Sequence, residues 1–269
     1  LQPRHETKLS RNRRDSVLRP AVSGGNVNRS SLPMSKTRRL TLLLAALGLG
    51  ATLLAQFGGF RGFGGGQIYV DYETKTAREI GTRSVGTPEW TNPVGFEKDV
   101  FTFVRVRRAR HPYMPGGNWA TDTPDSDLNL SYRLQQITSI RTDPDGRYVR
   151  LTDPDLADYP FLYIVEPGRL YLHPEEVTAL RAHLLNGGFL MLDDFWGTEE
   201  WNRFEESMKL VFPDRPIVEI DNADPIFHAV YDLDDRYQIP GQWALMRGTT
   251  YRNDGYVARW RGIYDDNGR

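Results

Sequence analysis

Residues 161–197 read FLYIVEPGRLYLHPEEVTALRAHLLNGGFLMLDDFWG, and this stretch decides the fold class. FLYIV at 161–165 is a continuous apolar run, typical of a strand covered on both faces. A helix is expected to begin at Pro174, with carboxylates in its first turn, and to end at Gly187, since glycine adopts the left-handed conformation that ends helices. FLML at 189–192 is expected to be the next buried strand. This order of strand, helix and strand predicts a parallel βαβ unit.

The flanking sequence extends the same alternation of strands and helices. The further elements that we expect are a strand at 101–106 (FTFVRV), a helix at 124–140, a short strand at 148–151, a helix at 198–212 and a strand at 217–220. Asp125 or Asp127 is available to cap the first of these helices, and Thr198 the second. The sequence therefore predicts an α/β fold with a doubly wound, mostly parallel sheet.

The C-terminal residues indicate an incomplete hairpin. Residues 256–264 have the pattern of a strand, and Asn267-Gly268 is a strong signal for a two-residue hairpin turn. Only Arg269 follows this turn. We therefore expect the C-terminal part to be truncated and the last strand to lack its partner.

Composition and charge exclude several classes of chemistry. The chain has 269 residues and no Cys, so it has no disulfide, no thiolate nucleophile and no Cys-ligated zinc. Residues 1–39 hold 10 Lys+Arg and 2 Asp+Glu, whereas the remainder holds 24 Lys+Arg and 33 Asp+Glu, a net charge of -9. Because nucleic-acid surfaces need clustered positive charge, the acidic body argues against a nucleic-acid partner.

The N-terminal part has the pattern of a targeting segment. Residues 1–33 are rich in Arg, Ser and Pro, and we expect them to be disordered and to lie upstream of the true start at Met34. Residues 34–55 combine a basic start, an apolar run and small residues, which predicts a signal peptide and export. An uncleaved signal anchor is the alternative, and would be the only membrane contact. Residues 56–95 are expected to form a Gly-rich linker and irregular lead-in, and residues 96–269 the α/β domain.

Ligands of doubly wound sheets bind beyond the carboxyl ends of the strands, so the residues that follow each strand are the candidate site. The candidate crevice residues are Trp119, Asp122, Asp125, Asp127, Glu166, Arg169, Asp193, Asp194 and Trp196. The three aspartates at 122–127 could equally cap a helix, and the tryptophans could be packing residues. Asp193 and Asp194 repel each other unless a cation, an Arg or hydrogen-bond donors compensate them. No cofactor is expected, with a divalent cation as an alternative, because residues 122–127 lack the Gly and distal Glu of an EF-hand loop.

Residues 101–269 resemble the bacterial domain of unknown function 4159 family. The motifs that carry the resemblance are FTFVRVR, DTPDSDLNLSYRLQQIT, YPFLYIVEPGRLYL, LLNGGFLMLDDFWG, ADPIFHAVYDL and RGIYDDNGR, in this order. The resemblance implies a flavodoxin-like fold related to class I glutamine amidotransferases, in proteins that are usually exported. It also implies MoxR-type ATPases and von Willebrand A-domain membrane proteins as envelope partners. The family has no established activity.

The resemblance places Asp194 where related enzymes carry their nucleophile, on a sharp turn after a strand. Class I amidotransferases need a thiolate there, so we expect no glutamine amidotransferase activity. The first hypothesis is a non-catalytic binding or scaffolding module of the cell envelope, expected if the crevice carboxylates are paired to Arg or N–H groups. The alternatives are a carboxylate-dependent hydrolase acting on carbohydrate, which needs two free carboxyl groups about 5–9 Å apart, and a divalent-metal site.

Overall fold

The computed structural model describes residues 70–71, 73–96, 99–109, 113, 118–266 and 268. The expected disordered start at 1–33, the expected signal at 34–55 and residues 56–69 of the linker lie outside the described residues. The chain divides into two units, Leu1–Gln56 and Phe57–Arg269, and the fold below is that of the second. In the part of the chain that is described, no helix combines the length and the apolar character needed to cross a membrane.

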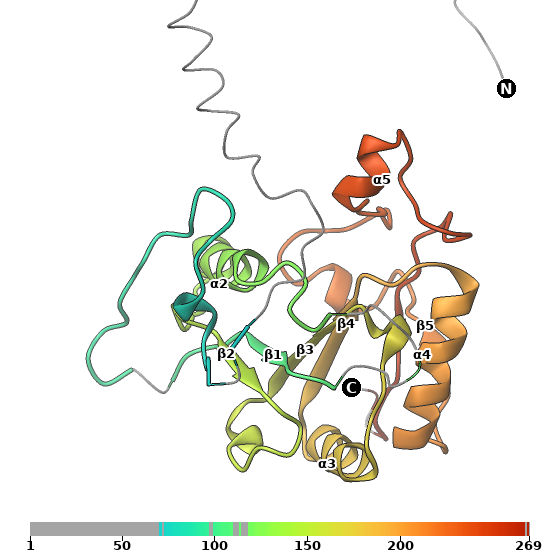
Figure 1. Cartoon of the computed structure of the whole chain (residues 1–269), viewed down its shortest axis with the longest axis horizontal. Coiled ribbons are helices and arrows are strands. Elements are labelled where there is room, and N and C mark those ends of the chain that lie inside the picture. The colour runs from blue at the N-terminus through green and yellow to red at the C-terminus, as the bar shows by residue number, and fades with distance from the viewer. Residues whose placement is uncertain are drawn as a thin grey trace, which may run out of the picture. The chain divides into compact units, whose positions relative to one another are not determined.

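A sheet of four parallel strands forms the centre of this unit, in the order β2-β1-β3-β4 (Figure 1). The strands are β1 (Val104–Val106), β2 (Arg147–Val149), β3 (Phe161–Val165) and β4 (Phe189–Asp193). The chain passes from β2 over β1 to β3, so the strand order reverses at β1, as it does in the flavodoxin order 2-1-3-4-5. The predicted α/β fold with a doubly wound parallel sheet is confirmed.

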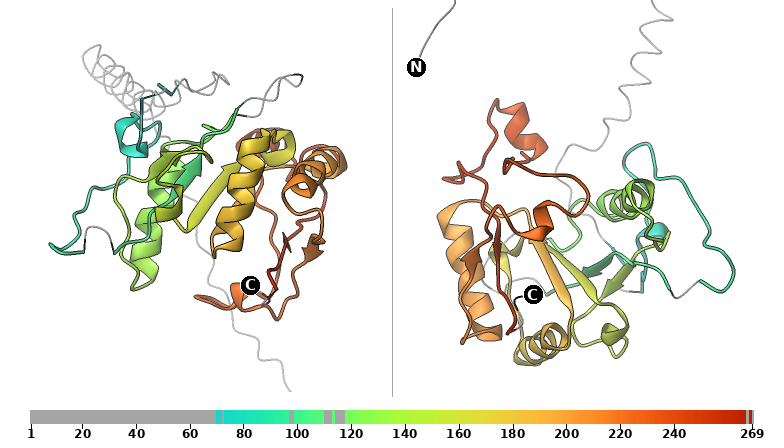
Figure 2. Two further views of the ribbon diagram at one scale, coloured as in Figure 1. Left: turned by 90° about the horizontal axis from the view of Figure 1, so that it is seen from below. Right: turned by 180° about the vertical axis from the view of Figure 1, so that it is seen from behind.

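Helices pack on both faces of the sheet, because side chains along each strand alternate between two apolar clusters. The helices are α2 (Asp125–Ile137), α3 (Pro174–Leu185) and α4 (Gly197–Val211). Leu162 and Ile164 of β3 belong to the cluster that α3 and α4 cover. Tyr163 and Val165 belong to the opposite face, where Leu130 of α2 packs. The left view of Figure 2 shows α2 on one side of the sheet and α3 and α4 on the other.

Strand β4 lies at one edge of this sheet, and the prediction that it is a buried strand is wrong. Phe189 and Met191 are 51% and 37% exposed, whereas Leu190 on the other face packs against the core. An apolar run predicts burial but does not distinguish an edge strand from a central one. The apolar pattern also predicts that Leu184, Leu190 and Phe161 are buried between helix and sheet. They are only partly buried, and Phe161 lies on the face opposite to Leu190.

Helix α3 begins and ends as its sequence predicts. Pro174 is its first residue, and the Glu176 carboxylate accepts a hydrogen bond from the N–H of His173 at 2.8 Å. The helix ends before Gly187, which has a φ of 99°. Proline at the start and left-handed glycine after the end are the local signals that fix both boundaries.

The starts of α2 and α4 differ from the prediction. Asp125 and Asp127 do not cap α2, whose N-cap is Pro124, and both carboxylates bind side chains outside the helix. Thr198 does not cap α4, which begins at Gly197. Its N–H instead donates to the carboxylate of Asp254 at 2.9 Å. Contacts with residues distant in the sequence therefore replace the local capping hydrogen bonds that we expected.

Short elements complete the fold. They are η2 (Ala77–Glu79), η3 (Leu156–Asp158), η4 (Pro167–Arg169), η5 (Pro225–Phe227), α5 (Gln242–Met246), β5 (Val218–Glu219) and β6 (Arg261–Gly262). Ala77 of η2 is fully buried in a cluster with Leu128 and Tyr148, so the lead-in is packed onto the domain. Strands β5 and β6 pair antiparallel, so the expectation that the last strand lacks a partner is wrong.

Candidate functional site

Three acidic residues at the carboxyl edge of the sheet have a left-handed backbone. Glu166 follows β3 with a φ of 51°, Asp194 follows β4 with a φ of 57°, and Asp122 precedes α2 with a φ of 61°. Val165 pairs with Asp193, and the Glu166 N–H donates to the Asp193 carbonyl at 3.0 Å, so β3 and β4 end side by side. Non-glycine residues adopt this conformation at an energetic cost, and such positions cluster at functional sites.

Asp194 forms the sharp turn between β4 and α4, and donors from two segments hold its carboxylate. Its Oδ1 accepts from the indole Nε1 of Trp196 at 2.9 Å and from the guanidinium of Arg252 at 2.8 Å. The same guanidinium lies 5.5 Å from the centroid of the Trp196 ring. Asp194 is therefore a paired carboxylate. The turn at which the resemblance implies a nucleophile holds an ion pair in this chain.

Asp193 and Glu166 are also bound by donors. The hydroxyl of Tyr163 donates to Asp193, whose pKa is raised by loss of hydration and by the charges of Asp194 and Asp122. The carboxylate of Glu166 accepts from the N–H of Asn118 at 2.8 Å and from the hydroxyl of Thr121 at 3.0 Å. Glu166 thus ties the loop before α2 to the end of β3.

A buried arginine, which the sequence did not single out, organises this edge. Arg105 of β1 is 0% exposed, and all five of its N–H donors are used. It binds the carboxylate of Asp127 through Nε at 2.8 Å and through Nη2 at 3.1 Å. Its remaining donors go to the carbonyls of Trp119 and Thr121 and to the hydroxyl of Ser126. Arg105 therefore fixes the loop that carries Asp122.

Asp122 is the exception at this edge. Within the described part of the chain, its side chain accepts no hydrogen bond, although its carbonyl accepts from Ser126 at 2.9 Å. Loss of hydration at its carboxyl raises its pKa, and the charges of Asp194 and Glu166 add to this effect, while Arg105 opposes it. Among the described residues, Asp122 therefore has a carboxylate without a hydrogen-bond donor, and the charges of Asp194 and Glu166 act on it.

The remaining candidates lie apart from these four acids or serve to support them. Asp125 binds Thr82, Ser84 and the N–H of Arg83, so it anchors the lead-in. Asp127 is 1% exposed and paired. Trp119 packs edge-on against Tyr148 at 5.3 Å. The backbone carbonyl of Arg169 accepts from buried Arg108, and Trp196 is 8% exposed. The candidates whose charges act on one another are Asp122, Glu166, Asp193 and Asp194.

Two of the kinds of site that the sequence left open can be compared with the side chains at this edge. A hydrolytic site was expected to need two free carboxyl groups beside an aromatic face. Of these four acids, three accept hydrogen bonds from side chains or N–H groups, namely Asp193, Glu166 and Asp194, and only the side chain of Asp122 does not. Among the residues that the structure describes, no group of three or more His, Asp or Glu side chains is arranged to hold a metal ion.

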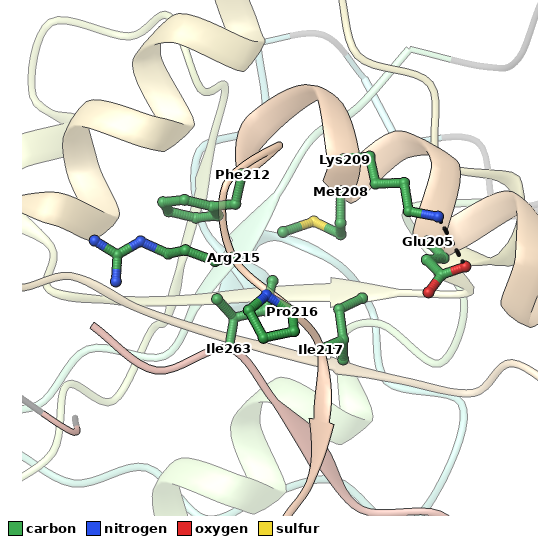
Figure 3. Close-up of a pocket in the computed structure, with 8 residues that line it drawn as sticks. All are labelled: Glu205, Met208, Lys209, Phe212, Arg215, Pro216, Ile217 and Ile263. Carbon is green, nitrogen blue, oxygen red and sulfur yellow. Dashed lines mark hydrogen bonds and ion pairs between the residues drawn. The ribbon is translucent and has the colours of Figure 1, made fainter. Parts of the chain in front are cut away.

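A separate hollow of about 260 Å³ lies toward the end of α4 that is remote from Asp194 (Figure 3). Its apolar floor is made by Met208, Phe212, Pro216, Ile217 and Ile263, and Glu205, Lys209 and Arg215 also line it. Glu205 and Lys209 are ion-paired at 3.2 Å. No predicted site residue lines this hollow.

Comparison with known proteins gives a family and no activity. The family described as "Domain of unknown function (DUF4159)" matches residues 102–269, in agreement with the resemblance of the motifs. A search of curated proteins finds no match to this chain.

Proposed function

The chain belongs to the DUF4159 family, and on that premise we propose that it is a non-catalytic binding module whose acidic carboxyl edge binds a cationic group of a partner. The observation that carries the proposal is the hydrogen bonding of the four acids at this edge. Three of them are held by donors, which fixes them in place, and Asp122 retains an unpaired carboxylate. A rigid acidic surface with one uncompensated charge is suited to electrostatic recognition.

The pairing of these acids also supports binding over hydrolysis. An ion pair and hydrogen bonds make a carboxylate a weaker base and nucleophile, and Oδ1 of Asp194 is bound by both Trp196 and Arg252. Glutamine amidotransferase chemistry requires a thiolate, and the sequence has no Cys. We therefore propose that this domain functions by binding a partner at its carboxyl edge.

Asp122→Asn tests the proposal, because the amide keeps the size of the side chain and removes its charge, and Asn also adopts the left-handed conformation. We expect a fluorescently labelled hexalysine peptide to bind the variant about threefold to fivefold more weakly, the effect of losing one surface ion pair of up to about 1 kcal/mol. Fluorescence anisotropy at low ionic strength measures this. Glu206→Gln is the control, since it removes the same charge at an exposed position on α4, about 14 Å along the helix from its first residue Gly197.

The same substitution should stabilise the fold, in a way that depends on pH. The pKa of Asp122 is raised in the folded state, so the wild-type protein loses stability as the pH rises from about 4 through the raised pKa. Asp122→Asn avoids this loss, so its melting temperature should be slightly higher than the wild-type value at pH 7 and equal to it below about pH 4, a small effect because Asp122 is exposed. If Asp122→Asn changes neither hexalysine binding nor stability, Asp122 is not part of the binding site and the proposal is contradicted.

We further propose that the module works outside the cytoplasm, in the cell envelope, beside MoxR-type ATPases and von Willebrand A-domain membrane proteins. The support is the signal pattern at 34–55 and the family resemblance. A tagged chain that starts at Met34 should be recovered outside the cytoplasm and shortened near Ala55. Recovery of an unshortened chain in the cytoplasmic fraction would contradict the proposal.

A further inference from the structure

Residues 252–254, here called the strap, lie across the turn between β4 and α4. Arg252 donates to the carboxylate of Asp194 at 2.8 Å, and Asn253 donates to the carbonyl of Trp196 at 3.3 Å. Asp254 accepts from the N–H of Thr198 in the first turn of α4 at 2.9 Å. Each strap residue thus binds a different residue of the turn, 56 to 58 positions away in the sequence.

The turn binds the guanidinium of Arg252 by two independent means. The carboxylate of Asp194 accepts a charge-assisted hydrogen bond, and the face of Trp196 lies 5.5 Å from the guanidinium carbon. Trp196 is buried, and its own N–H is bonded to the same Asp194 oxygen, so the acceptor and the ring are fixed relative to each other. An acceptor beside an aromatic face is the arrangement that suits a planar cation better than the compact ammonium of lysine.

We propose that Asp194 and Trp196 form a seat for a guanidinium group, and that Arg252 occupies this seat in cis until an arginine side chain of a partner displaces it. This inference rests on the proposed binding function and names its ligand class as an arginine-bearing polypeptide. It also makes the strap an internal competitor that lowers the affinity for such a partner.

The strap is attached in a way that permits displacement. Its three residues are all exposed, and its contacts with the turn are polar. Exposed ion pairs contribute little net stability, so exchanging one arginine for another costs little. Tyr251 and Tyr256, on either side of the strap, contact each other at a centroid distance of 4.6 Å, so the strap is a short loop closed at its base.

The test is a titration of the full chain with N-acetyl-arginine amide, followed through the indole N–H signal of Trp196 by NMR. Arg252→Ala should bind the probe about twofold to sixfold more tightly than the wild-type chain, because the internal competitor is gone and an exposed ion pair holds the seat only weakly. Arg259→Ala is the matched control, since Arg259 is an exposed arginine paired with Glu219. Adding Asp194→Asn to Arg252→Ala should abolish the gain, and the uncharged N-acetyl-citrulline amide should not bind.

The inference is overturned if Arg252→Ala and Arg259→Ala bind the arginine probe equally, or if citrulline binds as well as arginine. Melting curves check the fold, and Arg252→Gln repeats the test with a side chain that keeps part of the strap contact. Loss of the fold in both variants would make the strap a structural element and would also overturn the inference. If Asp122→Asn weakens hexalysine binding while Arg252→Ala gains nothing, the guanidinium seat fails and the proposed function stands.

Discussion

Arg105→Met should lower the free energy of unfolding by about 3–5 kcal/mol, the largest single-residue effect that we expect in this domain. The substitution leaves the carboxylate of Asp127, which is 1% exposed, without its counter-ion. It also removes the donors to the carbonyls of Trp119 and Thr121. Water does not solvate an unpaired charge inside the fold, so most of this cost is the desolvation penalty of the Asp127 carboxylate. Urea denaturation measures the change.

A companion substitution and a control make the origin of this effect measurable. Arg105→Met combined with Asp127→Leu should cost less than Arg105→Met alone, since no charge then remains buried, although the freed carbonyls keep part of the penalty. Arg133→Met is the control, because Arg133 is an exposed arginine on α2 with a hydrogen bond to Gln136. A cost for Arg105→Met no larger than that of Arg133→Met would mean that the buried ion pair does not fix the loop.

This arginine also illustrates how far the sequence could predict the site. Phe103 and Arg105 stand two residues apart in FTFVRV, so the alternation of a strand places a charge on a face shared with an aromatic side chain. A charge at such a position needs a buried partner, and that signal could have found Arg105 before the structure. Glu166 and Asp194 could be predicted as site residues because each directly follows a strand. The residues after parallel strands meet at one edge of the sheet.

The contacts of the strap could not be predicted in this way. Arg252 is 58 residues from Asp194, and residues 251–255 have no periodicity that would place them in a helix or a strand. Local signals also failed where a tertiary contact replaced them, as when Asp254 satisfied the N-terminus of α4 in place of Thr198. The same limit explains β4, whose apolar residues carry no information about whether a further strand or helix covers them.

Leu180→Ala should lower the free energy of unfolding by about 2–5 kcal/mol, because it empties a site at the centre of the core. Leu180 lies on α3, is 0% exposed and packs in the cluster that joins α3 and α4 to the sheet. The loss combines the burial of the removed methyl and methylene groups with the cavity that remains. The urea midpoint should fall while the slope of the transition stays unchanged, since the surface exposed on unfolding is almost the same.

Leu185→Ala supplies the matched control, as the same substitution on the same helix at a position that is 49% exposed. Its cost should stay within about 0.5 kcal/mol, the range of surface substitutions away from special features. The difference between the two variants isolates burial from helix propensity, because both replace leucine by alanine in α3. Equal costs at Leu180 and Leu185 would contradict the placement of α3 on the sheet. The position of Glu166 and Asp194 at one edge would then lose its support, since α3 is the crossover that makes β3 and β4 parallel.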